Sequence, residues 1–238
     1  INLELIFSDI EMLDRRLDNA KKRLKADKKA QAEIDVLEKI KVALEQGKCA
    51  RTVELTDEEK EEIKDLYLLT SKPVLYIANV SEEQIENVEN DEKVKQVKEF
   101  AKTEGAKVIP LCVKIEEELS SLEGEDKKEM LEALGLSESG LDKVVKTSYD
   151  LLGLMSFLTA GEPEVRAWTI KKGTKAPQAA GKIHSDIERG FIRAEVVSYD
   201  DLIREGSMLA CKEKGLVRSE GKEYVMQDGD IVLFRFNV

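Results

Sequence analysis

The sequence has 238 residues, of which 37% are charged and only 5% aromatic. This length is enough to bury the core of one large domain or of two ordinary ones, and the composition favours helical structure over a β-sandwich. No apolar run approaches the roughly 20 residues that a membrane-spanning helix needs, and no signal peptide opens the chain, so we expect no membrane partner.

The formal net charge of −11 is unevenly distributed along the chain. Residues 155–238 contain 13 basic and 13 acidic residues, whereas the first 154 contain 25 and 36. This step in composition predicts a domain boundary near residue 155. The acidic part is unsuited to non-specific nucleic-acid binding. Because the sequence begins at Ile1 and not at Met, we expect a further segment to precede it.

The three cysteines are odd in number and far apart, at positions 49, 112 and 211. This spacing excludes a disulfide framework and a CxxC metal site, and it fits the reducing cytosol. We therefore predict a cytoplasmic protein.

Residues 8–46 have the pattern of a helical hairpin. Ser8 is placed to cap a first helix, and a polar break at 26–29 separates it from a second helix that ends at Gly47, a typical C-terminal cap. Apolar residues repeat in both helices at intervals of three or four, as in a coiled-coil seam: Ile10, Leu13, Leu17, Ala20, Leu24, Ala30, Ile34, Leu37, Ile40 and Leu44. Two interpretations stay open, a packed hairpin with solvated flanks and an arm that binds a partner.

A βαβ unit is predicted to follow. The capping-box sequence at 56–59 begins a helix that we expect to end near Thr70. Residues 74–78 are apolar without alternation, which is typical of a strand buried on both faces of a parallel sheet. An amphipathic helix over 91–103, with Phe100 turned inward, and a second apolar segment at 108–113 complete the unit. Helical segments then continue from 115 to 152.

From Met155 onward short alternating runs predict a small α+β domain. We expect strands over 164–170, 192–197, 224–226 and 231–236, and short helices around 178–184 and 198–204. Ile192, Ala194 and Val196 are predicted to share one face of the second strand. Asp228-Gly229 is a hairpin signal.

The sequence Asn79-Val80-Ser81-Glu82 follows the first predicted strand. Ligands in open α/β sheets bind beyond the carboxyl ends of the strands, and the carboxamide of Asn79 can both donate to and accept from a purine edge. On its own this string is also compatible with an ordinary polar loop between a strand and a helix.

The context of this loop resembles the Obg-like ATPases, the YchF family. Lys72-Pro73 and the run through Glu82 resemble that family, whose loop departs from the Asn-Lys-x-Asp of ordinary GTPases. The resemblance implies that Asn79 and the backbone of Val80 contact adenine. The resemblance also implies that Glu82 marks the loss of guanine preference. In ordinary GTPases the aspartate of this loop accepts hydrogen bonds from N1–H and the 2-amino group of guanine, and adenine has neither donor. Residues 111–114 resemble the loop that closes over the base, which adds Cys112 and Val113 to the purine site.

A longer match covers the C-terminal part of the chain. Five runs resemble the TGS domain of the same family, a ubiquitin-like β-grasp module: 157–161, 165–170, 176–184, 190–194 and 228–238. The fold implied is α/β plus α+β: a partial P-loop G domain with an inserted antiparallel helical (coiled-coil) hairpin, followed by the TGS domain. We assign residues 1–72 to the hairpin and the helix after it, 73–154 to the C-terminal part of the G domain, and 155–238 to the TGS domain.

One half of the predicted TGS domain is basic, with seven basic and two acidic residues between Val165 and Arg193. Such a segment can approach RNA phosphates, although a solvated loop explains the charge as well. The candidate RNA or ribosome contacts are Arg166, Lys171, Lys172, Lys175, Lys182 and Arg193. His184, the only histidine, has no nucleophile or metal cluster near it in sequence, so we expect a hydrogen-bonded structural role. Trp168 is expected to pack in the core.

Nucleotide hydrolysis by this class needs a GxxxxGK[ST] loop, whose amides, lysine and hydroxyl bind the phosphates and Mg²⁺. None of the three Gly-Lys pairs in this sequence is followed by Ser or Thr. We therefore expect no catalytic residue and no metal ligand in this chain, no ATP hydrolysis by it alone, and no tightly bound nucleotide.

The resemblance implies an intact enzyme that uses ATP, with GTP possible, together with Mg²⁺. Its partners would be the ribosome or ribosomal RNA, with no sequence-specific DNA. The alternative is a non-catalytic module that recruits the ribosome, RNA or a protein and whose nucleotide binding is vestigial.

Overall fold

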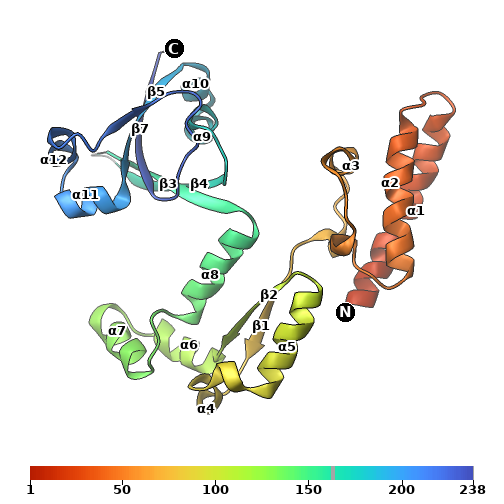
Figure 1. Ribbon diagram of the computed structural model, residues 1–238, viewed down its shortest axis with the longest axis horizontal. Coiled ribbons are helices and arrows are strands. Elements are labelled where there is room, and N and C mark those ends of the chain that lie inside the picture. The colour runs from red at the N-terminus through yellow and green to blue at the C-terminus, as the bar shows by residue number, and fades with distance from the viewer. Residues whose placement is uncertain (162–163, 238) are drawn as a thin grey trace. The chain divides into compact units, whose positions relative to one another are not determined.

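The computed structural model describes residues 1–161 and 164–237 (Figure 1). Val238, the last residue of the C-terminal resemblance, lies outside them. The chain divides into two compact units, Ile1–Leu141 and Asp142–Val238, which are described separately. Within the described residues, no helix combines the length and the apolar character that crossing a membrane requires.

The first unit begins with two long helices, α1 (Asn2–Leu24) and α2 (Ala30–Glu45), which pack side by side (Figure 1). The predicted apolar repeat forms their shared core, in which Leu13 and Leu37 are fully buried. The prediction that Ser8 caps the first helix is wrong. The N-cap is Ile1, seven residues before Ser8. Its carbonyl accepts the first helical hydrogen bonds, and the apolar seam extends to the buried Ile6.

The second helix ends at a glycine, as predicted. Gly47 has a φ of 76°, a left-handed conformation that few other residues adopt without strain. The amide of Gly47 donates to the carbonyl of Leu44 at 2.8 Å, and that of Lys48 donates to Ala43 at 3.0 Å. These two bonds form a Schellman motif, which satisfies carbonyls that the helix leaves free.

A buried carboxylate fastens the base of the hairpin to the segment after it. Asp9, on α1, is fully buried and accepts hydrogen bonds from the amides of Leu69 and Thr70, both at 2.8 Å. It also accepts from the hydroxyl of Thr70 at 2.6 Å, and that hydroxyl accepts from the amide of Ala50 at 3.0 Å. The contacts hold two short 3₁₀ helices, η1 (Ala50–Thr52) and η2 (Leu69–Ser71), against the hairpin.

The helix predicted from the capping box is much shorter than expected. The box itself is present: Thr56 accepts from the amide of Glu59, whose carboxylate accepts from the amide of Thr56. The helix α3, however, spans only Asp57–Glu62 and does not reach Thr70. None of its residues is buried, so no packed face stabilises further turns.

A βαβ unit follows, as predicted, with β1 (Leu75–Asn79), α5 (Glu92–Thr103) and β2 (Lys107–Leu111). The two strands pair in parallel along their whole length. Between β1 and α5 lie the short helices α4 (Glu82–Ile85) and η3 (Val88–Asn90).

Two burial predictions for this unit are wrong. Ile77 is 45% exposed, whereas its register partner Ile109 on β2 is 6% exposed, so within the described residues this face of the sheet is covered over β2 but not over β1. Phe100 is 52% exposed and contacts the ring of Tyr76 edge-on instead of entering the core.

Three helices follow β2: α6 (Val113–Ser120), α7 (Gly124–Ala133) and α8 (Gly140–Leu151). The carboxylate of Glu116 on α6 accepts from the amides of Gly140 and Leu141 at 2.7 and 3.1 Å, so it caps the start of α8. A Cβ at position 140 would lie 2.7 Å from that carboxylate, which explains the glycine.

The second unit contains a five-stranded sheet in the order β4-β3-β7-β5-β6. Among the strands of this sheet that the structure describes, only β3 and β7 pair in parallel. The strands are β3 (Leu154–Ala160), β4 (Val165–Lys171), β5 (Phe191–Ser198), β6 (Arg218–Glu220) and β7 (Asp230–Phe236). Helices α9 (Ala176–Ile183) and α10 (Ser185–Arg189) contribute to the main core on one face. Helices α11 (Tyr199–Glu205) and α12 (Met208–Glu213) cover part of the other face.

Three details of this unit differ from the predictions. Residues 224–226 are not a strand; only Val225 forms a bridge, with Lys175. Asp228-Gly229 therefore does not join two strands of a hairpin, and the amide of Ser156 donates to the Asp228 carboxylate at 2.8 Å. A register shift between Phe191 and Arg193 turns Ile192 outward, so it does not share a face with Ala194 and Val196.

Candidate functional site

The carboxyl ends of β1 and β2 border a hollow of about 440 Å³. Parallel pairing places the two strand ends at the same edge of the sheet, so the loops that follow them lie together. The hollow is lined by Asn79, Val80, Ser81, Glu82, Glu83, Cys112, Val113 and Lys114. All five predicted purine-site residues are in this set.

Asn79 is the last residue of β1, and a main-chain contact orients its carboxamide. The amide of Val113 donates to the Asn79 Oδ1 at 3.2 Å, so the oxygen faces the second loop. The carboxamide nitrogen of Asn79 then retains both of its donor hydrogens for a group in the hollow. The structure thus presents a hydrogen-bond donor at the position where the sequence predicts a purine contact.

The backbone of Val80 has fewer hydrogen-bonding groups available for a base than predicted. Its amide donates to the carbonyl of Leu111 at 2.9 Å and extends the strand pairing by one residue. Only the carbonyl of Val80 is left as a main-chain group that can contact a base, and its side chain is buried.

Glu82 forms an ion pair across the hollow with Lys114, a residue that the sequence analysis did not include in the site. The Lys114 Nζ lies 2.5 Å from the Glu82 Oε1, and this hydrogen bond raises the pKa of Lys114. The side chains of Lys114 and Glu82 are 68% and 49% exposed, so the pair orients the carboxylate more than it stabilises the fold. The signal for Lys114 in the sequence is its place as the last residue of the second loop, 111–114.

Cys112 and Val113 lie in the site in different ways. The Cys112 side chain is 4% exposed and packs in the hydrophobic cluster beneath the hollow, with Val94 and Ile115. Val113 is 54% exposed and begins α6. Cys112 can therefore contribute only its backbone, whereas Val113 presents an apolar surface against which a flat ring can pack.

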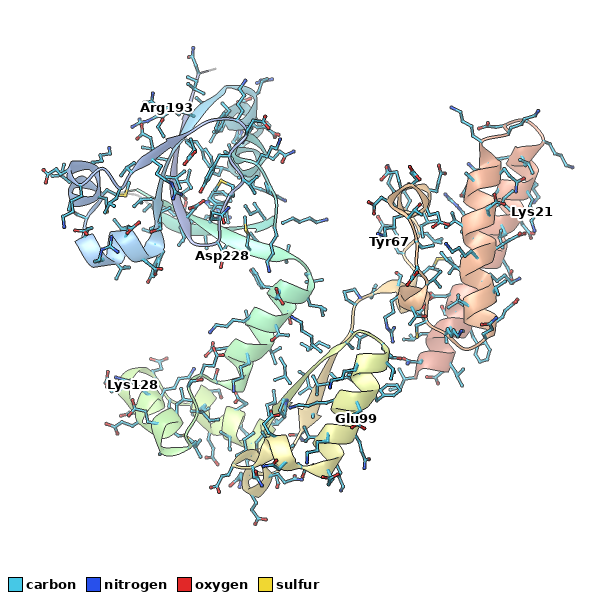
Figure 2. All side chains as sticks on the ribbon, in the orientation of Figure 1. Lys21, Tyr67, Glu99, Lys128, Arg193 and Asp228 are labelled. Carbon is cyan, nitrogen blue, oxygen red and sulfur yellow. The ribbon has the colours of Figure 1, made fainter. Side chains whose placement is uncertain are left out.

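The six candidate RNA contacts of the second unit are all exposed, but they do not gather in one place. Arg166 and Lys171 lie on the edge strand β4, and two strands separate them from Arg193 on β5 (labelled in Figure 2). Lys182 is on α9.

Four of the six make ion pairs or ring contacts within the unit. Lys172 pairs with Asp150 at 2.7 Å, Lys175 with Glu223 at 2.5 Å, and Arg193 with Glu195 at 3.2 Å. The Arg166 guanidinium lies 4.2 Å from the centre of the Trp168 ring. These acidic partners lie outside the basic stretch of sequence, and they offset part of its charge.

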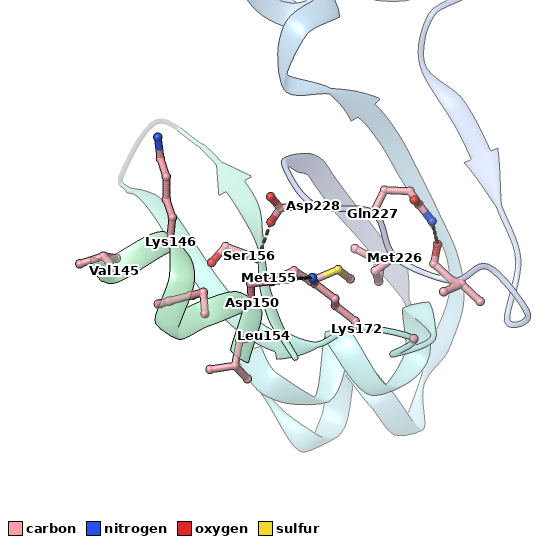
Figure 3. A pocket seen from close by; sticks show the side chains of 13 residues that line it. Val145, Lys146, Asp150, Leu154, Met155, Ser156, Lys172, Met226, Gln227 and Asp228 are labelled. Atoms are coloured by element: carbon pink, nitrogen blue, oxygen red, sulfur yellow. Dashed lines mark hydrogen bonds and ion pairs between the residues drawn. The ribbon is translucent and has the colours of Figure 1, made fainter. Parts of the chain in front are cut away.

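A larger hollow of about 720 Å³ lies in the second unit beside α8 and β3 (Figure 3). Three of its charged groups have partners within the unit: Lys172 pairs with Asp150, and Asp228 accepts from the amide of Ser156. It contains none of the predicted purine-site residues. We interpret these polar contacts as attaching α8 and the 225–228 segment to the sheet.

His184 and Trp168 have the structural roles that were predicted. The His184 Nδ1 accepts from the amide of Asp186 at 3.2 Å and so caps α10. Trp168 packs against the core, and its Nε1 donates to the hydroxyl of Thr159 at 2.9 Å. Among residues 1–161 and 164–237, no cluster of three or more His, Cys, Asp or Glu side chains is arranged to hold a metal ion.

Comparison with known proteins gives consistent matches. A family model described as YchF-GTPase_C, protein of unknown function (DUF933), matches residues 154–237. Over its whole length the chain is 55% identical to the ribosome-binding ATPase YchF of Bacillus subtilis and 46% identical to that of Haemophilus influenzae. The chain spans 65% of the length of each of these two relatives.

A solved structure also resembles the chain in three dimensions. The YchF GTPase of Schizosaccharomyces pombe superposes on 99% of this chain with a TM-score of 0.85 and 36% sequence identity. The match covers 64% of that protein.

Proposed function

We propose that this chain is part of a protein of the YchF family, and that it forms the base-recognising and partner-binding part of a ribosome-associated P-loop NTPase that prefers ATP. The relatives are named ribosome-binding ATPases, and the solved relative is named a GTPase, so GTP remains a possible second substrate. The protein would act in the cytoplasm, where ribosomes are found. Residues 155–238 would form its TGS domain, consistent with the mixed five-stranded sheet.

The orientation of Asn79 is the observation that supports nucleotide binding most directly. Because Val113 holds the carboxamide oxygen, the nitrogen is free to donate to N7 of a purine. The carbonyl of Val80 can accept from the 6-amino group of adenine. Guanine carries an acceptor oxygen at the same position, which a carbonyl would repel, so this pair of groups favours adenine.

The Glu82–Lys114 pair supports the same preference. In ordinary GTPases a free aspartate accepts from guanine N1–H and the 2-amino group. Here the Glu82 carboxylate is held by Lys114 at 2.5 Å. Because it is engaged by Lys114, this carboxylate is not free to accept from N1–H and the 2-amino group of guanine.

The phosphates and Mg²⁺ would be bound by residues outside this sequence, which contains no GxxxxGK[ST] loop. A bound nucleotide with Mg²⁺ supplies the transferable phosphoryl group and the charge that stabilises it. The residues of this chain hold and select the base. We therefore expect no ATP hydrolysis by the chain alone.

Ribosome binding is tested by co-sedimentation. We expect the 238-residue chain to sediment with ribosomes, and the Lys171→Gln/Lys172→Gln/Lys175→Gln variant to sediment less. A matched control, Lys93→Gln/Lys102→Gln/Lys128→Gln, removes the same charge from exposed positions of the first unit and should bind normally. Failure of the unaltered chain to sediment contradicts ribosome binding; equal sedimentation of both variants removes these three lysines from the interface.

A further inference from the structure

The turn of the helical hairpin is strongly basic, although the first unit as a whole is acidic. Residues 21–29 end α1, form the turn and lead into α2, and they contain six basic residues against one acidic residue. We call this segment the basic tip. Its six basic side chains are all exposed: Lys21, Lys22, Arg23, Lys25, Lys28 and Lys29. The tip is thus a local exception to the net charge of −11 over residues 1–154, which argued against nucleic-acid binding there.

The basic tip lies at the free end of the hairpin, opposite the end where the chain begins (Figure 1). Because α2 has 16 residues, each adding about 1.5 Å, the turn lies about 24 Å from the far end of that helix. The contacts that fasten the hairpin to the segment after it are made nearer its base, by Asp9 and Lys39. Among the described residues, no hydrogen bond or ion pair joins the tip to anything outside the hairpin.

The acidic side chains beside the tip are already engaged. Glu33 is only 7% exposed and pairs with Arg23. Glu38 pairs with Lys21 (labelled in Figure 2) at 2.8 Å. Four basic residues of the tip are left without an ion-pair partner in the part of the chain that the structure describes: Lys22, Lys25, Lys28 and Lys29.

Two of these lysines lie where the helix itself disfavours them. Lys28 and Lys29 directly precede α2, and Lys29 is its N-cap, with no capping bond from its side chain. The N-terminus of a helix carries a partial positive charge, so it favours acidic residues and disfavours lysine. The carboxylate of Asp27 accepts from the amide of Lys29 at 2.9 Å, and even with Asp27 counted the tip has a net charge of +5. An external anion explains this charge, whereas the helix does not.

We propose that the basic tip binds the phosphate backbone of double-stranded RNA. The inference rests on the proposed function, since the ribosome supplies such duplexes, and it gives the hairpin the partner-binding role that its sequence left open. A lysine ammonium is a point charge that contacts phosphate oxygens without selecting a base. Double-stranded RNA is bound mainly through its shape, its phosphates and its 2′-hydroxyls, because side chains cannot read its deep, narrow major groove.

The residue types of the hairpin favour a duplex over a single strand, and RNA over an acidic protein. Unpaired bases are held by stacking on aromatic rings, and no Phe, Tyr, Trp or His occurs between Phe7 and Tyr67. Interfaces between proteins have an apolar core. In the described chain, no large apolar side chain between Phe7 and Val42 is exposed.

Binding of the whole chain to a fluorescent RNA duplex of mixed sequence, measured by anisotropy over a range of salt, tests the proposal. We expect the tip variant, Lys22→Gln/Lys25→Gln/Lys28→Gln/Lys29→Gln, to bind at least about tenfold more weakly. Its slope of log K against log salt should be shallower by about 3.6, because each lost phosphate contact on a duplex removes about 0.9. The same four changes to arginine keep the charge, so affinity should stay within about threefold.

A matched control separates the tip from lysines in general. Lys48→Gln/Lys93→Gln/Lys102→Gln/Lys128→Gln removes four exposed lysines elsewhere in the first unit and should bind the duplex as the unaltered chain does. An equal loss of affinity in this control, unchanged binding by the tip variant, or no binding by the unaltered chain overturns the proposal.

A melting curve distinguishes a ligand site from a structural role. Because α2 disfavours lysine at its start, Lys28→Gln/Lys29→Gln should melt at the temperature of the unaltered chain or slightly above it. A clearly lower melting temperature would show that these lysines stabilise the hairpin, and it would remove the reason for assigning them to a ligand.

Competitors identify the ligand. Polyglutamate at equal charge concentration that displaces the labelled duplex as well as unlabelled duplex does would identify an acidic protein and overturn the RNA assignment. Tighter binding of a DNA duplex of the same length, or of a single-stranded RNA, would overturn it too.

The outcomes for the tip and for the ribosome are distinguishable. If the chain sediments with ribosomes but the tip variant binds the duplex unchanged, the tip is wrong and the proposed function stands. If the tip variant loses the duplex and the unaltered chain does not sediment, ribosome binding is wrong and duplex binding by the tip stands.

Discussion

At the scale of single residues, two polar side chains have their geometry fixed by backbone amides. Asp9 accepts from the amides of Leu69 and Thr70 in a fully buried position, and Asn79 accepts from the amide of Val113 at the rim of a hollow. The first contact stabilises the fold, because all its partners are internal. The second leaves the donor end of the carboxamide free, and this difference makes Asn79 a candidate for binding.

Replacement of Asp9 by alanine should destabilise the first unit strongly. Two main-chain donors and the Thr70 hydroxyl lose their acceptor in a buried position, which we expect to cost about 3 kcal/mol of unfolding free energy. Urea unfolding followed by far-UV circular dichroism measures this cost. Asp18→Ala, at an exposed position of the same helix, should change it by less than about 0.5 kcal/mol. Similar values for the two variants would show that the buried contact contributes little.

At the scale of elements, a second carboxylate joins four parts of the first unit. Glu104 follows α5 and accepts from the Tyr76 hydroxyl of β1 at 2.7 Å, from Arg51 of η1 at 3.0 Å and from Asn2 of α1 at 3.4 Å. The Arg51 guanidinium also donates to the carbonyl of Thr70 at 3.4 Å, while its buried Nε has no hydrogen-bond partner within the described part of the chain. The hairpin is therefore attached to the βαβ unit through one acidic residue.

The attachment should be sensitive to acid. The hydrogen bonds from the Tyr76 hydroxyl and from Arg51 hold the pKa of Glu104 below its usual range. A carboxylate with a depressed pKa in the folded state stabilises the fold above its unfolded pKa and loses that contribution as the pH falls through the folded value. We expect the stability difference between the unaltered chain and Glu104→Gln to be largest near neutrality and to shrink below about pH 4.5.

Chemical unfolding at a series of pH values between 3 and 7 checks this expectation. The control Glu99→Gln changes an exposed carboxylate of α5 (Figure 2) and should follow the pH profile of the unaltered chain. A Glu104→Gln profile parallel to that of the control would show that Glu104 does not link the elements through its charge.

The elements also show what the sequence can and cannot predict. The helical hairpin and the βαβ unit follow from long, regular apolar patterns, so their existence was predictable. The inner strand β3, next to the edge strand β4, was not predictable, since both its faces are partly buried and its alternation is weak. The edge strand β6 contains only Arg, Ser and Glu and has no apolar pattern at all.

The candidate site, too, was predictable only in part. Parallel strands bring their carboxyl ends together, so the meeting of the Asn79 and Val113 loops follows from the topology. The loss of the Val80 amide to Leu111 depends on strand register, and the Glu82–Lys114 pair depends on side-chain conformation. Neither is encoded in a local pattern of residue types.

At the scale of the whole chain, the residues proposed for binding fall into both units. The purine site and the basic tip lie within residues 1–141, and the lysines proposed for ribosome binding, Lys171, Lys172 and Lys175, lie within residues 142–238. The two compact units meet at Leu141, whereas the step in charge predicted a boundary near residue 155. The difference arises because α8 belongs largely to the second unit. The assignment of 1–72, 73–154 and 155–238 to three domains stays a prediction.

The most direct test of the account is a nuclear magnetic resonance titration of the isotopically labelled chain with adenosine monophosphate and, separately, with guanosine monophosphate. We predict millimolar binding, with amide shifts confined to residues 79–83 and 112–114, larger for the adenine nucleotide and absent in Asn79→Ala. Shifts elsewhere in the chain, equal or larger shifts with the guanine nucleotide, or unchanged shifts in Asn79→Ala would contradict the claim that this edge of the sheet selects the base.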